Sequence, residues 1–226
     1  MKLYGHPWST NTRKALAVFA EKGHEPTLSV VMLPTGEHKQ PAYLRIHPFG
    51  RVPALDDDGF VLYEARAICA YADAALSGPR LVPESARERA RVDQWINICD
   101  AYFAPYAQPM IVEQLFRQFL GGDVDRAAIE NGRQMIQPAL DELDRQLAEH
   151  PYVAGAAFTL ADLHWMPYFE YLARIGEGAA IDRRPKLRAW FDRVAERPAW
   201  KHVARTGPQP WDPAVAADVV ARLRPR

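Results

Sequence analysis

The feature that most constrains the fold is a change of pattern near residue 80. Before it, short apolar or β-branched runs alternate with amphipathic stretches, whereas after it apolar residues recur almost only at helical spacing. The first group is β-α-β, with strands predicted at 2–4 and 27–32 on either side of a helix at 10–22. A short helical turn at 43–46 follows. The second group is β-β-α, with strands predicted at 52–55 and 60–63 and a helix at 64–76. This order indicates a small α/β domain followed by an all-α domain.

The boundary between the two domains is marked by turn-forming residues. Gly78, Pro79 and Pro83 fall within the nine residues 77–85, a density of glycine and proline that is typical of a linker. We expect a first domain over 1–77, a linker over 78–86, a helical domain over 87–205 and a tail over 206–226. The helices of the second domain are predicted at 87–120, with a bend at Pro105 and Pro109, and at 125–149, 159–175, 185–196 and from Pro198.

Composition excludes several classes of function. Lys and Arg number 28 and Asp and Glu number 28, so the chain lacks the basic field that nucleic-acid binding requires, and we expect a small ligand. No export signal and no apolar run of bilayer length occurs, so we expect a cytoplasmic protein that binds no membrane. Cys69 and Cys99 are too few for a disulfide framework or a thiolate metal site, and their apolar surroundings predict buried thiols.

Ser9 stands at the junction of the first predicted strand and helix. Hydroxyl side chains are typical helix N-caps, and this is the simplest interpretation of Ser9 or Thr10. The same position suits catalysis, because backbone N–H groups and the positive end of the helix dipole stabilise an anion there. A thiol with a pKa of about 8.5 needs about 2.7 kcal/mol of differential stabilisation to ionise two pH units lower.

Three further motifs are ambiguous on the residues alone. Glu37-His38-Lys39 and Glu64-Ala65-Arg66 lie beside predicted turns, where charged groups are commonly solvated surface. Val52-Pro53 has no spacing signal that favours a cis bond. In the second half, Thr159-x-x-Asp162 has the form of a helix capping box, with Phe158 and Leu163 as its hydrophobic staple.

Taken together, these residues resemble the soluble glutathione transferases, and in particular the phi class. The resemblance extends to about Arg205 and depends on several motifs at the right separations. They are Gly5-His6-Pro7-x-Ser9, Gly36-Glu37-His38-Lys39, Pro48-Phe49-Gly50-x-Val52-Pro53-Ala54-Leu55, Leu62-Tyr63-Glu64-Ala65-Arg66-Ala67-Ile68, Phe158-Thr159-Leu160-Ala161-Asp162-Leu163-His164 and Arg184-Pro185 through Trp190 to Arg197-Pro198-Ala199-Trp200.

The resemblance implies a thioredoxin-like first domain that binds glutathione as co-substrate, without a metal. By similarity, Ser9 donates a hydrogen bond to the glutathione sulfur, and His38 and Lys39 contact the glycine carboxylate. Val52, before a cis-Pro53, presents its backbone to the cysteinyl part of the tripeptide, which binds like an added strand.

At the γ-glutamyl end, the resemblance implies that Glu64 takes the ammonium group of glutathione. The family usually has serine next, where this chain has Ala65. One hydroxyl contact to the glutamyl carboxylate is therefore lost, although the Ala65 N–H at the helix start remains suitable for it.

The resemblance also implies a helical-bundle second domain that completes a hydrophobic electrophile site, and a homodimer. Phe49, in a Pro-Phe-Gly loop, is a candidate exposed anchor for the dimer, with local packing as the alternative. The candidate walls of the electrophile site are aromatic: Trp8, Tyr102, Phe103, Tyr106 and Phe116. Tyr4 is a rival catalytic residue that we interpret as packing. Thr10 excludes the cysteine-dependent mechanism of related bacterial enzymes and remains a second hydroxyl.

The expected function is conjugation of the glutathione thiolate to small hydrophobic electrophiles, as in detoxification. Glutathione-dependent peroxide reduction uses the same thiolate and stays an alternative. A non-catalytic protein of this fold that binds hydrophobic ligands or a protein partner is the second alternative, which the alanine at position 65 keeps open. A dehalogenase of the same fold is a third.

Overall fold

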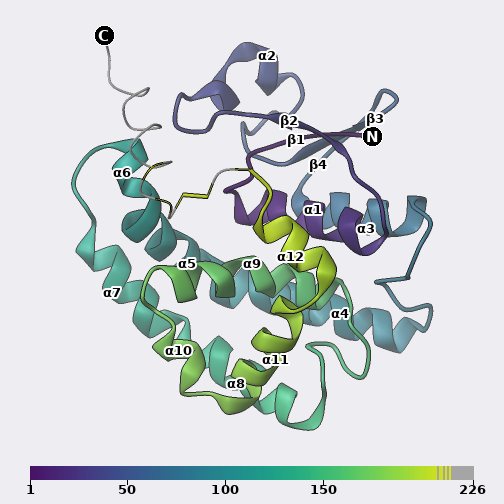
Figure 1. Cartoon of the computed structure of the whole chain (residues 1–226), viewed down its shortest axis with the longest axis vertical. Coiled ribbons are helices and arrows are strands. Elements are labelled where there is room, and N and C mark those ends of the chain that lie inside the picture. The colour runs from purple at the N-terminus through teal and green to yellow at the C-terminus, as the bar shows by residue number, and fades with distance from the viewer. Residues whose placement is uncertain (208, 211, 213, 215–226) are drawn as a thin grey trace. The chain divides into compact units, whose positions relative to one another are not determined.

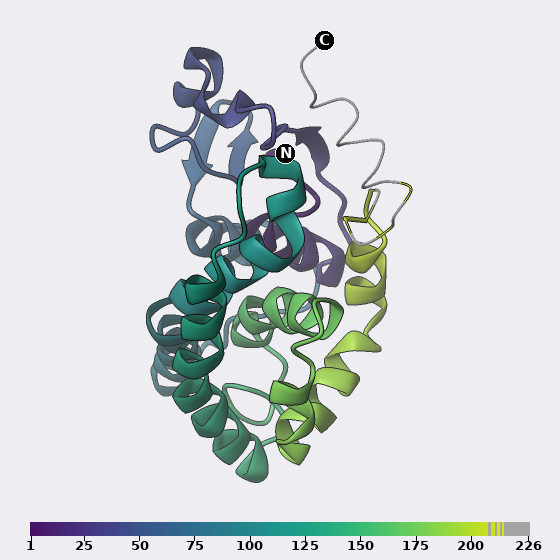
Figure 2. The ribbon, with the colours of Figure 1, turned by 90° about the vertical axis from the view of Figure 1, so that its left-hand side faces the viewer.

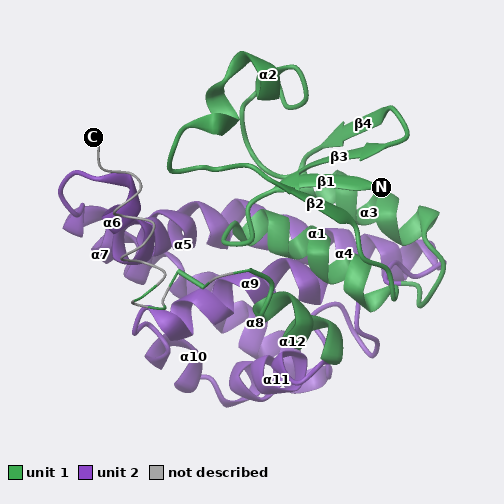
Figure 3. Cartoon of the chain, turned by 45° about the horizontal axis from the view of Figure 1, so that its top comes forward, with its two compact units in different colours: residues 1–80, 198–226 green, residues 81–197 purple. Residues whose placement is uncertain are grey.

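The computed structural model describes residues 1–207, 209, 210, 212 and 214. This part of the chain forms two compact units (Figure 3). Unit 1 comprises residues 1–80 and the described residues from Pro198 onward, and unit 2 comprises residues 81–197. The expected linker at 78–86 spans the point where the chain passes from unit 1 to unit 2. None of the described helices combines the length and apolarity needed to cross a membrane.

Unit 1 contains a four-stranded mixed sheet in the order β2-β1-β3-β4 (Figure 1). Its strands are β1 (Lys2–Gly5), β2 (Thr27–Val30), β3 (Ala54–Asp57) and β4 (Phe60–Tyr63). β1 pairs in parallel with β2 and antiparallel with β3, which in turn pairs antiparallel with β4. The predicted order of elements along the chain is confirmed, and so is the predicted hairpin. In its turn, Asp58 and Gly59 have φ 50° and 93°, and the Gly59 N–H donates to Asp56 Oδ1 at 2.8 Å.

Helices cover both sides of this sheet. α1 (Thr10–Glu21) and α3 (Ala65–Ala75) lie on one side, and α2 (Pro41–Leu44) lies on the other (Figures 1 and 3). Lys22, at the end of α1, connects this helix to the end of α3. Its buried Nζ donates to Asp73 Oδ1 at 3.2 Å and to the carbonyls of Asp73 and Pro79 at 2.8 and 3.0 Å. α12 (Pro198–Ala204) also belongs to unit 1, where it packs on α1, whereas the sequence placed it with the helical domain.

Unit 2 begins with a long helical run that changes its hydrogen-bonding pattern twice. α4 (Ala86–Ile98), α5 (Ala104–Ile111) and α6 (Arg117–Leu120) are joined by π-helical turns at Cys99–Phe103 and Val112–Phe116. These turns precede Pro105 and follow Pro109, the two prolines expected to bend the run. Proline lacks an N–H and its ring crowds the preceding turn, so the helical ladder adjusts on either side of it.

The second part of unit 2 corrects one prediction. The single helix predicted over 125–149 is two helices, α7 (Arg126–Met135) and α8 (Gln137–Glu149). Pro138 lies in the first turn of α8, where its missing N–H is tolerated, and so it starts a new helix. α9 (Leu160–Arg174) is almost wholly buried and lies in the middle of the helices of unit 2, green in Figure 2. α10 (Ala179–Asp182) and α11 (Pro185–Ala195) follow.

The predicted capping box at the start of α9 is confirmed. The Thr159 side chain accepts from the Ala161 N–H at 3.3 Å, while Asp162 Oδ2 accepts from the Thr159 N–H at 2.9 Å. Asp162 does more than cap the helix, because its Oδ1 also accepts from the Val153 N–H at 3.0 Å and from Trp190 Nε1 at 2.7 Å. Burial raises the pKa of the Asp162 carboxyl, and these donors act in the opposite direction.

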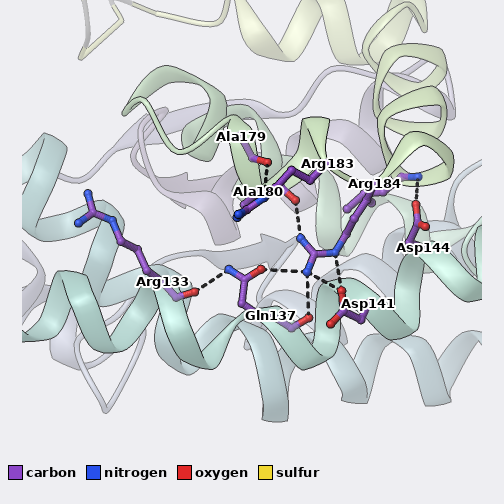
Figure 4. A network of polar contacts seen from close by, with 9 residues as sticks. Arg133, Gln137, Asp141, Asp144, Ala179, Ala180, Arg183 and Arg184 are labelled. Carbon is purple, nitrogen blue, oxygen red and sulfur yellow. Dashed lines mark hydrogen bonds and ion pairs between the residues drawn. The ribbon is translucent and has the colours of Figure 1, made fainter.

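A second polar cluster joins α8 to the α10–α11 corner (Figure 4). Arg184 precedes α11, and its guanidinium donates to Asp141 Oδ1 at 2.8 Å, to Gln137 Oε1 at 2.9 Å and to the Ala180 carbonyl at 2.6 Å. Nearby, Asp144 Oδ1 accepts from the Leu187 N–H at 2.8 Å in the first turn of α11. One planar side chain thus fixes three segments of unit 2.

Candidate functional site

Ser9 is the N-cap of α1, as its position in the sequence predicts. Its backbone is extended, at φ −74° and ψ 125°, and its half-buried Oγ accepts a hydrogen bond from the Thr12 N–H at 3.3 Å. Accepting this bond uses a lone pair and leaves the hydroxyl hydrogen available. Among the residues that the structure describes, no acceptor for the Ser9 O–H is found. Ser9 can therefore cap α1 and donate to a ligand at the same time.

The environment of Ser9 favours a negative charge. α1 is three turns long, its first turn carries no acidic residue, and its N-terminal N–H groups face the loop in which Ser9 lies. A thiolate placed there would interact with the helix dipole and with the hydroxyl together.

The loop before α1 is held by its own hydrogen bonds. The His6 N–H donates to Thr12 Oγ1 at 3.3 Å, the Trp8 N–H donates to His6 Nδ1 at 3.2 Å, and the Ser9 N–H donates to the His6 carbonyl at 2.9 Å. Burial lowers the pKa of His6 to about 4, so the ring is neutral near pH 7 and its Nδ1 is free to accept. Gly5 is required beside Thr12, because a Cβ at Gly5 would lie 2.5 Å from Thr12 Cγ2.

The sheet register brings three of the predicted site segments to one edge. Tyr4 near the end of β1 is opposite Ala54 at the start of β3, and Ala54 is opposite Tyr63 at the end of β4. Ser9 follows β1, Val52 precedes β3 and Glu64 follows β4, so all three lie at the same edge of the sheet in unit 1.

The Val52-Pro53 peptide bond is cis. Within the described residues, neither the N–H nor the C=O of Val52 forms a hydrogen bond with another backbone group. An extended peptide could pair with both groups, in the manner of an added strand.

Glu64 carries a feature that the sequence does not reveal. It is exposed, it directly precedes α3, and its φ is +74°, a region that residues other than glycine seldom adopt. A non-glycine residue in this conformation costs about 1–3 kcal/mol in strain, and such residues are concentrated at functional sites. Ala65 is the first residue of α3, which has no side-chain cap, so its N–H is placed to meet an anion.

His38 and Lys39 lie on a 3-10 turn over Glu37–Lys39. Lys39 Nζ donates to the Phe49 carbonyl at 3.0 Å, which leaves two further hydrogens on the ammonium group. The half-buried His38 has a lowered pKa, first because of burial and then because of the Lys39 charge, and its buried Nδ1 has no partner in the described residues. Gly50 packs against this turn with φ +54°, and a Cβ there would lie 2.5 Å from the His38 carbonyl oxygen, so glycine is required at this position.

The five aromatic candidates for the wall of the electrophile site differ in how far their side chains are exposed. Trp8 is 6% exposed and packs edge-on against His6. In unit 2, Tyr102 is 65% exposed, and Tyr106 and Phe116 are half-buried.

Phe103, in contrast, is 0% exposed, and its ring stacks on Phe169 at 5.7 Å and packs against Trp165 at 4.9 Å. Phe103 is therefore a core residue of unit 2, and we remove it from the candidate wall. Helical spacing alone could not separate it from its exposed neighbour Tyr102.

The rival residues lie in packed positions. Tyr4 is within β1, and its ring meets Tyr43 edge-on at 6.5 Å. Thr10 is buried in the first turn of α1. In the described part of the chain, no group of three or more His, Cys, Asp or Glu side chains is placed to hold a metal ion.

Comparison with known proteins connects this arrangement to one family. A model described as glutathione S-transferase, N-terminal domain, matches residues 8–75, and one described as glutathione S-transferase, C-terminal domain, matches residues 126–193. Glutathione S-transferase 3 from Zea mays is 36% identical over 220 residues, which are 96% of this chain and 99% of that protein.

Two solved structures extend the likeness to the whole fold. Glutathione transferase F7 from Populus trichocarpa has a TM-score of 0.85 and 34% identity, covering 90% of this chain and 97% of that one. Glutathione S-transferase I from maize, in complex with an atrazine glutathione conjugate, has a TM-score of 0.82 and 31% identity, covering 90% of this chain and 95% of that one. The chain therefore belongs to the glutathione S-transferase family, in which it is most similar to the phi class.

Proposed function

We propose that this protein transfers the thiolate of glutathione to small hydrophobic electrophiles, with Ser9 as the hydroxyl that stabilises the thiolate. The observation that carries the proposal is the Ser9 cap, whose Oγ accepts from Thr12 and whose O–H is left to donate. A maize relative of the same family and fold was solved with a glutathione conjugate, which supports glutathione as the co-substrate.

The tripeptide would bind along the sheet edge in unit 1. Its cysteinyl part pairs with the N–H and C=O of Val52, and its sulfur lies at Ser9. The ammonium group of the γ-glutamyl end pairs with the Glu64 carboxylate, and the glutamyl carboxylate accepts from the Ala65 N–H at the start of α3. The glycine carboxylate lies near His38 and Lys39, whose ammonium group has hydrogens to spare.

Catalysis would then consist of ionising the thiol and holding the two reactants together. Lowering a thiol pKa by two units corresponds to about 2.7 kcal/mol, which a hydroxyl donor and a helix N-terminus supply together. Proximity contributes further, because both reactants are bound. In unit 1, Trp8 beside Ser9 is the candidate wall for the electrophile. In unit 2, the candidates for contact with it are Tyr102, Tyr106 and Phe116.

We further propose that the enzyme acts in the cytoplasm in detoxification, as a homodimer. Cys69 and Cys99 are both buried in the described chain, which suits a reducing compartment. Phe49 is 64% exposed at the tip of its loop, where an aromatic side chain suits a role as interface anchor. Phe49→Ala should shift sedimentation toward the monomer, and an unchanged sedimentation coefficient would remove Phe49 from this role.

The central test is ultraviolet difference spectroscopy of bound glutathione across pH, with Ser9→Ala, Ser9→Thr and Ser85→Ala compared with the wild type. Ser85 is the N-cap of α4 without a side-chain cap bond, so it controls for the loss of a hydroxyl at a helix start. The wild type should ionise the bound thiol about two pH units below the free value of about 8.5. Ser9→Ala removes the hydroxyl and leaves the helix N-terminus, so it should raise the pKa of the bound thiol by about one unit and lower the conjugation rate at pH 7 several-fold, while Ser9→Thr keeps both.

Two outcomes would contradict this assignment. Ser9→Ala with full glutathione binding and full activity would remove Ser9 from catalysis. Saturable glutathione binding by the wild type with no thiolate at neutral pH would instead indicate a ligand-binding protein. A panel of electrophiles and organic hydroperoxides then separates conjugation from peroxide reduction, which uses the same thiolate.

A further inference from the structure

The segment that follows α12 returns to the loop that carries Ser9. Gly207 turns at φ +69° directly beside Pro7, because a Cβ at Gly207 would lie 3.1 Å from Pro7 Cγ. Two residues further on, Gln209 Oε1 accepts a hydrogen bond from Arg13 at 3.1 Å. Residues about 200 positions apart in the sequence thus meet within unit 1.

Arg13 connects this segment to the Ser9 loop. It lies on α1, one turn after Ser9, and is 0% exposed. Its Nε donates to the Pro7 carbonyl at 3.0 Å, while its terminal nitrogen donates to Gln209. A guanidinium is planar, so its N–H groups point in fixed directions relative to one another. If Gln209 moves, the guanidinium of Arg13 reorients, and the Nε–H that donates to the Pro7 carbonyl moves with it.

The side chain of Gln209 is itself oriented by two further bonds. Its amide nitrogen donates to the Gly207 carbonyl at 3.0 Å and to the Thr206 carbonyl at 3.4 Å. These acceptors define which end of the amide faces Arg13, so the oxygen is the group that Arg13 meets.

We infer that Gln209 is a positioning residue for Ser9, acting through Arg13 and the Pro7 carbonyl. The inference depends on the proposed role of Ser9 in stabilising the glutathione thiolate. Pro7 is two residues before Ser9, and a hydroxyl–sulfur hydrogen bond weakens steeply when its direction changes. Displacements of the order of 1 Å far from the reacting atoms are enough to slow an enzyme, because they misplace the catalytic group.

The test compares Gln209→Leu with Gln209→Glu in the full chain. Leucine removes the Gln209 oxygen that accepts from Arg13, whereas glutamate keeps an oxygen there and loses the donations to the Gly207 and Thr206 carbonyls. Gln134→Leu is the matched control, because exposed Gln134 on α7 bonds to Glu130 in unit 2. Three quantities are measured: the pKa of the bound glutathione thiol by ultraviolet absorbance, kcat and KM with glutathione, and amide hydrogen exchange over residues 6–13.

Gln209→Leu should raise the pKa of the bound thiol and lower kcat about tenfold, with KM for glutathione changed less than about twofold. It should also speed amide exchange in the Ser9 loop, while Gln209→Glu and Gln134→Leu stay near the wild type. Equal impairment of the Leu and Glu variants would overturn the inference, because the bond to Arg13 would not be the cause. So would a Gln209→Leu variant with normal kcat and thiol pKa, whatever its amide exchange.

Failure of the proposed function gives a different result. A wild-type protein that forms no thiolate with glutathione contradicts the role of Ser9, and with it the catalytic part of this inference. Amide exchange needs no glutathione, so it still reports whether Gln209 holds the loop: unchanged exchange in Gln209→Leu overturns the structural part as well.

Discussion

Asp162→Ala should destabilise the protein far more than the loss of an ordinary helix cap. The carboxylate is 0% exposed, and three buried N–H groups donate to it, those of Val153, Thr159 and the Trp190 indole. Alanine leaves all three donors without this acceptor, and each unsatisfied buried donor costs about 1–3 kcal/mol. We therefore expect the free energy of unfolding to fall by about 4 kcal/mol or more, compared with about 1 kcal/mol for a cap alone.

Two further variants divide this effect into its parts. Thr159→Val keeps the shape of the side chain and removes the hydroxyl, which accepts from the Ala161 N–H and donates to Asp162 Oδ2 at 3.3 Å, so it should cost about 1–2 kcal/mol. Asp162→Asn keeps one oxygen for Val153 and Trp190 but turns an NH2 group toward the Thr159 N–H. Two donors then face each other, and we expect an intermediate loss of about 2–3 kcal/mol.

The assay is urea unfolding at pH 7, followed by tryptophan fluorescence and by far-ultraviolet circular dichroism. Coincident transitions by the two probes justify comparing free energies between variants. The reasoning is refuted if Asp162→Ala lies within about 1 kcal/mol of Thr159→Val, since the buried donors would then contribute nothing beyond the cap.

Three other perturbations test the structure independently. The pKa of His6 is about 4 in the folded protein and 6.5 ordinarily, so the unfolded chain takes up the proton first as the pH falls. Acidification from pH 6.5 to pH 4 should therefore lower the free energy of unfolding by up to about 3 kcal/mol. His6→Asn, which can still accept from the Trp8 N–H, should weaken this pH dependence in urea unfolding at several pH values. Gly5→Ala should cost about 1–3 kcal/mol by thermal unfolding because of the contact with Thr12, and adding Thr12→Ser, which removes the clashing methyl group, should recover part of it; a stable single variant would contradict the close approach. Arg184→Met should lower the free energy of unfolding by about 2 kcal/mol, because the buried Ala180 carbonyl and the half-buried Gln137 amide lose their donor. An unchanged urea midpoint would show that the cluster in Figure 4 is dispensable.

Much of the first unit was predictable because its signals are local. The order of strands and helices along the chain, the hairpin turn at Asp58 and Gly59, and the Ser9 cap each depend on residues close together in the sequence. The capping box at Thr159 and Asp162 is local in the same sense. The break between α7 and α8 had a local signal as well, in Pro138, but the apolar stripe continues through it and suggested one helix.

The tertiary structure alone decided which residues carry strain and which are buried. The left-handed backbone of Glu64 is imposed where β4 meets α3, and no glycine marks it in the sequence. Phe103 and Tyr102 are adjacent and both aromatic, yet one is fully buried and the other is 65% exposed, because burial depends on the elements packed around a helix.

The sequence by itself determined the order of elements, the caps and turns, and the residues that could serve a thiol, since hydrophobic period and turn chemistry act over a few residues. Tertiary structure decided how separate segments meet: Val52 and Glu64 come to the edge where Ser9 lies through strand pairing, and Gln209 reaches Arg13 from the far end of the chain. Such contacts depend on packing between distant segments, and no local pattern encodes them.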